Sequence, residues 1–166
     1  MSAPLVATSQ PNNRSSSSMA AANPSAAAGS SLGLDSALLL NGQKAVTILQ
    51  NAEHIYLMGV RRMFPVASYL TYSLSQTRKR VIMVDGVGGL YKEQMAGLSK
   101  GDVLISISMA PYGGETQYCC EIANERKASV VAITDSSLSP IARMAAATLT
   151  VHEAEIYNFR ALACTM

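Results

Sequence analysis

The sequence predicts an α/β domain built on a parallel sheet with helices on both faces. Five short apolar segments alternate with segments of helical length, and each apolar segment ends in a polar or glycine-containing turn. The apolar segments are nearly continuous, which is typical of parallel strands buried on both faces. Because crossovers between such strands are right-handed, only a few doubly wound, three-layer arrangements remain.

The expected elements can be placed in order along the chain. Apolar residues at helical spacing predict a first helix around Ala45, Val46, Ile48, Leu49 and Ala52. The five strands are expected at HIYLMG (54–59), VIMVDG (81–86), DVLISIS (102–108), SVVAIT (129–134) and TLTV (148–151). The helices between them are expected at FPVASYLTYSLSQT (64–77), YKEQMAGLS (91–99), ETQYCCEIANERKA (115–128) and SPIARMAAA (139–147).

Residues 1–37 have a different character from the rest of the chain. They are rich in Ser, Ala, Asn and Pro, and the stretch SQPNNRSSSSMAAANPSAAAGSS carries a single charge, Arg14. Such a segment buries too little apolar surface to offset its chain entropy, so we expect it to be disordered. The domain is then expected to occupy residues 38–166.

The composition argues against several classes of function. The 166 residues carry a net charge of only +2, so there is no broad basic field for nucleic acid. No apolar run approaches the roughly 18 residues of a membrane span, and we expect a cytoplasmic protein without a membrane partner. The three cysteines, which include the adjacent Cys119 and Cys120, have no zinc-site spacing. We therefore expect free thiols, no metal and no cofactor.

The ligand site of such a sheet can be located before its ligand is known. In open α/β sheets, ligands bind beyond the carboxyl ends of the strands, where the strand order reverses. The loops at that end are GVRRMFP (59–65), DGVGGLY (85–91), SMAPYGGET (108–116) and TDSSLSP (134–140).

From about Ala45 to its end, the chain resembles the SIS (sugar isomerase, phosphosugar-binding) domain. The resemblance rests on AEHIYLMGVRRMFPVASYLTYSL and GDVLISISMAPYGGETQYCCEIANERKASVVAITDSSLSPIARMAAATLTV, followed by an expected last helix in which the chain stops. The form is similar to the effector domain of RpiR-type bacterial transcriptional regulators. The resemblance implies a five-stranded sheet of flavodoxin-like order, a site between the first and third strands, and a homodimer or higher homo-oligomer.

Two loops depart from the usual SIS pattern. The family turn GxGxS after the first strand keeps Gly59, but Arg61 and Met63 stand at its later positions. The family loop SxSGxT after the third strand keeps Ser108 and Thr116 at its ends, with the longer MAPYGGE between them. The ligand is expected to be a small phosphorylated sugar or a related anion.

The third-strand loop is the first candidate for ligand binding. Gly113 and Gly114 would let the backbone approach an anion, and the following helix would offer free N–H groups. The hydroxyls of Ser108, Tyr112 and Thr116 would add hydrogen bonds. The alternative is a plain strand-to-helix turn in which Thr116 or a neighbour caps the helix.

The first-strand loop is the second candidate. Gly59 is followed by Arg61 and Arg62, and one arginine is expected to hold the anion bidentately while the other is structural. The sequence leaves open which of the two faces the site.

Three other groups are weaker candidates. The stretch Asp85-Gly-Val-Gly-Gly follows the second strand and lacks the third glycine of a dinucleotide fingerprint, so we expect a turn that borders the pocket. Ser136 and Ser139 are sufficiently explained by turn and helix capping, with ligand contact as the alternative. His54, at the edge of the first strand, is interpreted as a half-buried strand residue.

The leading hypothesis is a non-catalytic, effector-sensing domain of RpiR type. Such regulators bind DNA through a helix-turn-helix domain, and residues 1–40 contain no pattern for one, so DNA would be reached only through a domain absent here. The alternative is a stand-alone sugar-phosphate aldose/ketose isomerase, with a base drawn from His152, Glu153 and Glu155. A third interpretation is a truncated fragment without function.

Overall fold

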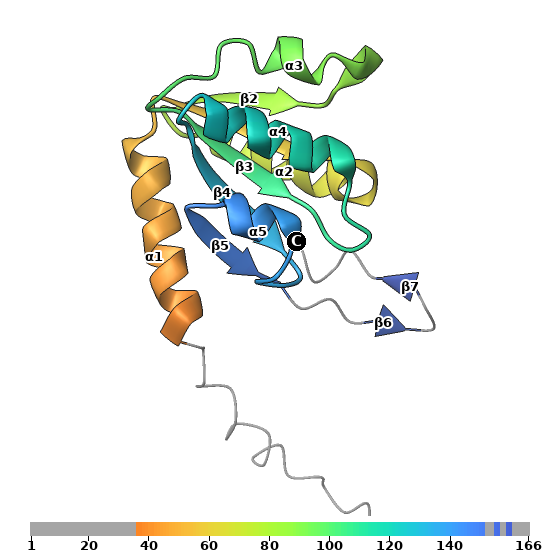
Figure 1. Cartoon of the computed structure of the whole chain (residues 1–166). Coiled ribbons are helices and arrows are strands. Elements are labelled where there is room, and N and C mark those ends of the chain that lie inside the picture. Colours follow the sequence, from red (N-terminus) through yellow and green to blue (C-terminus); the bar gives the residue numbers. More distant parts are fainter. Residues whose placement is uncertain (1–35, 152–154, 157–158, 161–166) are drawn as a thin grey trace, which may run out of the picture. The chain divides into compact units, whose positions relative to one another are not determined.

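Figure 1 shows the computed structural model, which describes residues 36–151, 155–156 and 159–160. The helices are α1 (Ser36–Asn51), α2 (Phe64–Ser75), α3 (Tyr91–Gln94), α4 (Gly114–Glu125) and α5 (Pro140–Met144), with 3-10 turns η2 (Arg61–Met63) and η3 (Val87–Gly89). The strands are β1 (His54–Gly59), β2 (Arg80–Val84), β3 (Val103–Ile107), β4 (Ser129–Thr134), β5 (Ala147–Thr150), β6 (Glu155–Ile156) and β7 (Phe159–Arg160).

The first five strands form one parallel sheet in the order β2-β1-β3-β4-β5. The chain runs from β1 outward to β2 and then returns to place β3 on the other side of β1. The strand order therefore reverses between β1 and β3, where Gly59 pairs with Ile107 at the carboxyl ends. This confirms the predicted doubly wound fold and its flavodoxin-like order.

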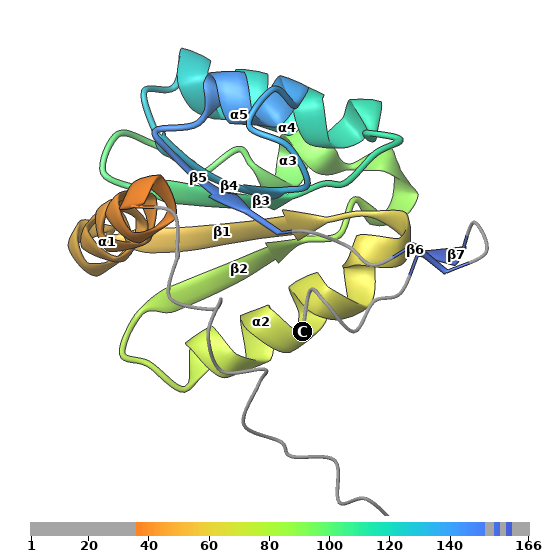
Figure 2. The ribbon, with the colours of Figure 1, turned by 90° about the horizontal axis from the view of Figure 1, so that it is seen from below.

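Helices cover both faces of this sheet (Figure 2). Side chains of β1 alternate between two core clusters, with Ile55 and Leu57 in one and Tyr56 and Met58 in the other. The first cluster packs under α1 and α2, and the second packs under α3, α4 and α5. Full burial of a side chain such as Leu57 contributes about 1.5–3 kcal/mol, so the two clusters hold the three layers together.

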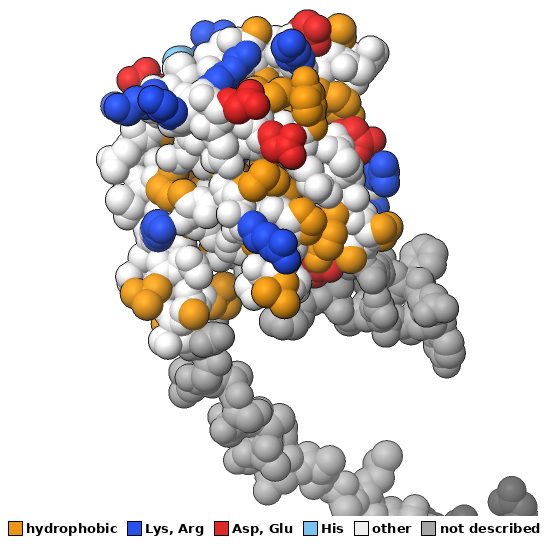
Figure 3. All heavy atoms as spheres, in the orientation of Figure 1, with side chains coloured by type: hydrophobic (Ala, Val, Ile, Leu, Met, Phe, Trp, Pro, Cys, Tyr) orange, Lys and Arg blue, Asp and Glu red, His pale blue; other side chains and the backbone are white. Residues whose placement is uncertain are grey.

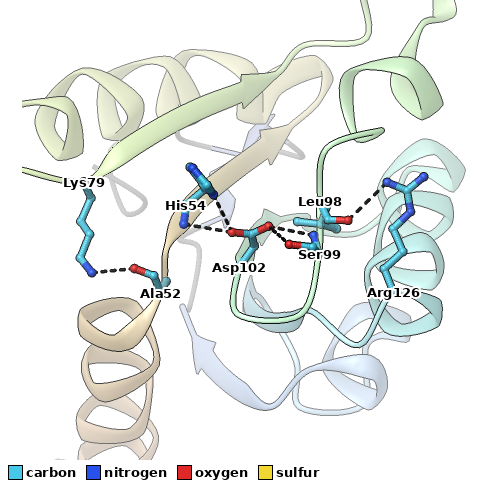
Figure 4. A network of polar contacts seen from close by, with 7 residues as sticks. All are labelled: Ala52, His54, Lys79, Leu98, Ser99, Asp102 and Arg126. Carbon is cyan, nitrogen blue, oxygen red and sulfur yellow. Dashed lines mark hydrogen bonds and ion pairs between the residues drawn. The ribbon is translucent and has the colours of Figure 1, made fainter.

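The helix α3 is shorter than the predicted span 91–99. The chain leaves the helix after Gln94, and Gly97, a poor helix former, follows. The guanidinium of Arg126 donates hydrogen bonds to the carbonyls of Met95 and Leu98, and Figure 4 shows the contact with Leu98. A distant arginine therefore stabilises an irregular segment where local spacing predicted a helix.

The two ends of the expected domain differ from the prediction. The helix α1 begins at Ser36, two residues inside the segment expected to be disordered, and the remainder of that expectation, residues 1–35, lies outside the described residues. Beyond Val151 a last helix was expected, but the four residues described there form the antiparallel pair β6 and β7. His152 and Glu153 lie outside the described residues.

The amino edge of the sheet is held by a polar network (Figure 4). Asp102 Oδ1 lies 3.1 Å from the backbone N and 2.9 Å from Nδ1 of His54, while Oδ2 accepts hydrogen bonds from the N–H and hydroxyl of Ser99. Burial raises the pKa of Asp102, but these hydrogen bonds outweigh it and hold the pKa below its usual value. Lys79 Nζ donates to the carbonyl of Ala52 at 2.6 Å, which joins the start of β2 to the end of α1.

The surface carries charges of both signs. On the face seen in Figure 3, Lys and Arg side chains are interspersed with Asp and Glu, and apolar groups lie between them. No helix in the described ranges is both long enough and apolar enough to cross a membrane.

Candidate functional site

A small pocket lies at the carboxyl edge of the sheet, beside the point where the strand order reverses. It has a volume of about 130 Å³. Its lining comes from the loops after β1 and β3: Val60, Arg61, Arg62, Met63, Ser108, Met109, Pro111 and Gly113. The structure therefore brings together the two segments that the sequence singled out, at the place where open α/β sheets bind ligands.

The two arginines after β1 have different partners. Arg62 Nη2 donates to the backbone carbonyl of Ala110 at 3.2 Å, which ties the first-strand loop to the third-strand loop. Arg61 Nη2 lies 3.3 and 3.4 Å from the two carboxylate oxygens of Glu115. The side chain of Arg61 is 62% exposed, and its backbone adopts a left-handed φ of 56°, which is uncommon for a residue other than glycine. Such backbone strain is frequently found at binding sites.

Asp135, directly after β4, anchors the third-strand loop. Its Oδ2 accepts the N–H of Ala110 at 3.1 Å, and its Oδ1 accepts the hydroxyls of Tyr112 at 2.9 Å and Thr134 at 3.2 Å. Burial raises the pKa of Asp135, but these hydrogen bonds outweigh it, so the pKa lies below its usual value. Tyr112, expected to bind ligand, thus has a structural partner for its hydroxyl proton.

The anchoring role of Asp135 was not predicted from the sequence. The available signal was its place as the first residue after a buried strand, at the carboxyl edge of the sheet. Its partners lie 23 and 25 residues away in the chain, so no local sequence motif predicts these contacts.

The helix α4 begins beside the pocket, at Gly114. The backbone carbonyl of Gly113 accepts hydrogen bonds from the N–H groups of Thr116 and Gln117, and no side chain caps the helix. A Cβ on Gly113 would lie 3.0 Å from Glu115 Oε2 and 3.1 Å from Val60, whereas a Cβ on Gly114 would meet nothing within 4 Å. A side chain at Gly113 would therefore require small shifts of Glu115 and Val60, whereas Gly114 leaves open space at the start of the helix.

Glu115 places a carboxylate at this helix end. The pKa of Glu115 lies below its usual value. Its backbone N–H lowers the pKa most, burial raises it, and Arg61 lowers it further. Tyr91, at the start of α3, is close enough that its pKa is raised by burial first and by the charge of Glu115 second. The loop after β2 thus lies near the site through Tyr91, a residue the sequence reasoning did not single out.

The two hydroxyl residues at the ends of the third-strand loop are both buried. Ser108 lines the pocket, and its backbone N–H donates to the carbonyl of Ile133 at 3.1 Å. Thr116 is fully buried, and its Oγ1 finds no hydrogen-bond partner among the described residues. A Cβ on Gly113 would lie 3.5 Å from this oxygen, so the Thr116 hydroxyl lies close to a residue that lines the pocket, and it does not cap the helix.

Gly59 has a packing role that the sequence did not reveal. A Cβ at this position would lie 2.9 Å from the carbonyl oxygen of Met63 and 3.0 Å from Cβ of Ala67. Only glycine therefore lets α2 start so close to the end of β1. Gly59 supports the first-strand loop, and its neighbours from Val60 onward line the pocket.

The loop after β2 forms a closed turn. Asp85 Oδ1 accepts hydrogen bonds from the N–H of Val87 and the amide of Gln94, and Gly86 has a left-handed φ of 65°. The ring of Tyr91 fills the space that a Cβ on Gly86 would need. These glycines therefore serve the turn, and the residues of this loop do not line the pocket described above.

The serines after β4 act as capping residues. Ser139 Oγ accepts the N–H of Ala142 at the start of α5, and Ser136 Oγ accepts the N–H of Leu138. The weaker alternative of ligand contact has no support among the residues that line the pocket.

One group of acidic and imidazole side chains lies at the opposite, amino edge of the sheet. Among the residues that the structure describes, Glu53, His54 and Asp102 bring three potential metal ligands within 4.8 Å of one another. Both carboxylate oxygens of Asp102 already accept hydrogen bonds. The cluster therefore serves to join strand ends, and His54, with 38% of its side chain exposed, is half-buried as the sequence predicted.

Comparisons with known proteins agree with this architecture. The family profile of the SIS domain matches residues 48–166. The sugar isomerase domain of an RpiR transcription factor from Sphaerobacter thermophilus is similar with a TM-score of 0.69 at 24% identity, over 78% of this chain and 77% of that one. The NanR protein of Vibrio vulnificus, solved with ManNAc-6P, is similar with a TM-score of 0.60 at 23% identity.

A third similar structure comes from Bacteroides fragilis. It is a candidate phosphosugar isomerase involved in capsule formation, with a TM-score of 0.60 and 16% identity, over 69% of this chain and 66% of that one. For NanR the shares are 70% and 47%, so this chain spans less than half the length of NanR. These likenesses support the fold.

Proposed function

Because the chain belongs to the SIS domain family, we propose that its pocket binds a carbohydrate derivative with an anionic group, such as a phosphosugar. One observation carries the proposal. Arg61, Arg62 and the start of α4 lie around one pocket, beside the point where the strand order reverses between β1 and β3. Guanidinium groups and helix N–H groups are the donors that phosphate and carboxylate prefer. The complex of the similar NanR with ManNAc-6P supports the same class of ligand.

The size of the pocket limits the ligand. Pockets for drug-sized molecules measure roughly 300–1,000 Å³. A volume of about 130 Å³ suits a compact ligand or the anionic end of a longer one. The sugar part would then extend past Gly114, where the surface is open.

We propose binding without catalysis. Aldose–ketose exchange needs a positioned base beside a carbon-bound proton. The eight residues that line the pocket include no carboxylate and no imidazole. Glu115 lies 3.3 Å from the guanidinium of Arg61, and its pKa is below the usual value, which makes its carboxylate a weak base.

The domain would then act as the effector-sensing part of an RpiR-type regulator. The ligand would bind two subunit arrangements of a homodimer with different affinities and so shift their populations. The similarity to the RpiR domain of Sphaerobacter thermophilus supports this role. Small-angle scattering with and without a bound sugar phosphate tests it, since an unchanged monomer in both samples would contradict the regulatory mechanism.

A thermal-shift screen with sugar phosphates and sugar acids tests ligand binding. A ligand at about 100 times its dissociation constant should stabilise the folded state by about 2.7 kcal/mol. Gly114→Val should abolish the shift, because its side chain would enter the open space at the start of α4. Gly42→Val is the matched control, since a Cβ on Gly42 in α1 also meets nothing within 4 Å. If the whole panel leaves the melting of folded wild-type protein unchanged, the proposed function is wrong.

The second candidate function is a sugar-phosphate isomerase. The likeness to the Bacteroides fragilis protein favours it, and a base from the segment after β5 would be required. Turnover of the same sugar phosphates, lost in Glu155→Gln, would establish this function in place of the binding role.

A further inference from the structure

We propose that Glu115 competes with anionic ligands for Arg61 and for the start of α4, and so lowers the preference of the pocket for doubly charged phosphate over singly charged anions. This inference rests on the proposed function, because it concerns the same pocket. Glu115 would then be a residue that adjusts how strongly the pocket distinguishes doubly from singly charged ligands.

The carboxylate of Glu115 stands where an anion would be expected. Both of its oxygens lie within 3.4 Å of Arg61 Nη2, and Glu115 is the acidic residue in the first turn of α4. Oε2 lies 3.0 Å from the position of a Cβ on Gly113, a residue of the pocket wall. An arginine, a helix end and a close glycine are the groups that hold anionic ligands elsewhere, and here a side chain of the protein meets all of them.

A second observation points to a ligand at this position. The hydroxyl oxygen of Thr116 is buried without a partner among the described residues, and it lies 3.5 Å from the same Gly113 Cβ position. Buried hydroxyls nearly always have a hydrogen-bond partner. Thr116 therefore has an unused donor beside the place where the Glu115 carboxylate lies.

The charge of Glu115 affects ligands of different charge unequally. Its carboxylate pairs with Arg61 and offsets the positive charge of that guanidinium at the pocket. A doubly charged phosphate is repelled by the carboxylate about twice as strongly as a singly charged anion at the same distance. The carboxylate therefore reduces the preference of the pocket for phosphate over singly charged anions such as sugar acids, and its removal should raise the affinity for phosphate more than the affinity for sugar acids.

The test compares wild type with Glu115→Gln, using inorganic phosphate and gluconate as probes at constant ionic strength. Glu115→Gln should bind phosphate about tenfold more tightly than wild type, and its gain for gluconate should be smaller, about threefold. Glu115→Asp keeps the charge and should show neither gain. Glu121→Gln, which removes an exposed carboxylate farther along α4, should behave as wild type.

The outcomes separate this inference from the proposed function. Equal phosphate affinities in wild type and Glu115→Gln, or phosphate binding by neither, would overturn the role of Glu115. A wild type that binds a sugar phosphate without any gain in Glu115→Gln refutes only that role. A gain for phosphate in Glu115→Gln, with no sugar derivative bound by either protein, refutes only the proposed function.

Discussion

The hydrogen bond between Tyr112 and Asp135 should stabilise the loop that lines the pocket, and a double-mutant cycle measures it. The Tyr112 hydroxyl lies 2.9 Å from Asp135 Oδ1. A hydrogen bond to a charged group contributes about 1.5–3 kcal/mol, and partial exposure of the pair reduces this to about 1–1.5 kcal/mol. Tyr112→Phe should lower the free energy of unfolding by that amount. Asp135→Asn should cost about 2–3 kcal/mol, because the bonds from Ala110 and Thr134 are weakened too.

Urea unfolding of wild type, both single variants and the double variant gives the coupling energy. We expect about 1–1.5 kcal/mol between the two positions. Tyr118→Phe, at an exposed tyrosine of α4, is the control and should leave stability unchanged. A coupling below about 0.3 kcal/mol, the usual limit of additivity, would refute the anchoring role of Asp135.

The same pair predicts a pH dependence. The folded-state pKa of Asp135 lies below its unfolded value of about 3.9, so its stabilisation is complete above that pH and is lost as the pH falls through the folded pKa. The difference in stability between wild type and Asp135→Asn should therefore shrink when unfolding is measured near pH 3 instead of pH 7. A difference that stays constant over this range would contradict the assignment.

Three further predictions concern the scaffold. Gly59→Ala should cost about 1–3 kcal/mol by urea unfolding, because its Cβ would overlap the carbonyl oxygen at the start of α2, and an unchanged midpoint would refute this packing role. Asp102→Asn should cost about 3 kcal/mol, because buried donors lose their ionised partner; a loss below about 1 kcal/mol would contradict the account of the amino edge. Burial raises the pKa of Cys119 to about 12 and that of Cys120 to about 11, so in a Cys164→Ser variant both thiols should resist alkylation until the protein is unfolded. Rapid modification of the folded variant would show that α4 is not packed as described.

The sheet could be predicted because its information is local. Each of β1, β3 and β4 is a short apolar run that ends in a polar turn, and burial on both faces is visible in the residues themselves. The strand order was implied by the resemblance to a family, because the sequence of an apolar strand does not specify which other strand it pairs with. The carboxyl edge then followed as the place of the candidate site.

The details of the site could not be predicted because their partners lie far apart in the chain. The contacts of the two arginines depend on loops that are distant in sequence, because Arg62 meets Ala110, 48 residues away, and Arg61 meets Glu115, 54 residues away. The end of α3 depends in the same way on Arg126, 31 residues beyond Met95. The spacing of apolar residues along the sequence predicts helices and strands, but it does not predict which loops contact one another in the fold.

An anionic carbohydrate derivative is proposed to bind where the loops after β1 and β3 meet. The most direct measurement is a titration of the ¹⁵N-labelled protein with the ligand found in the thermal-shift screen, followed by backbone amide chemical shifts. We expect the largest changes at Arg61, Gly113 and Gly114, with little change at the amino edge around Asp102. Changes that centre on the amino edge, with the carboxyl-edge amides unmoved, would contradict it.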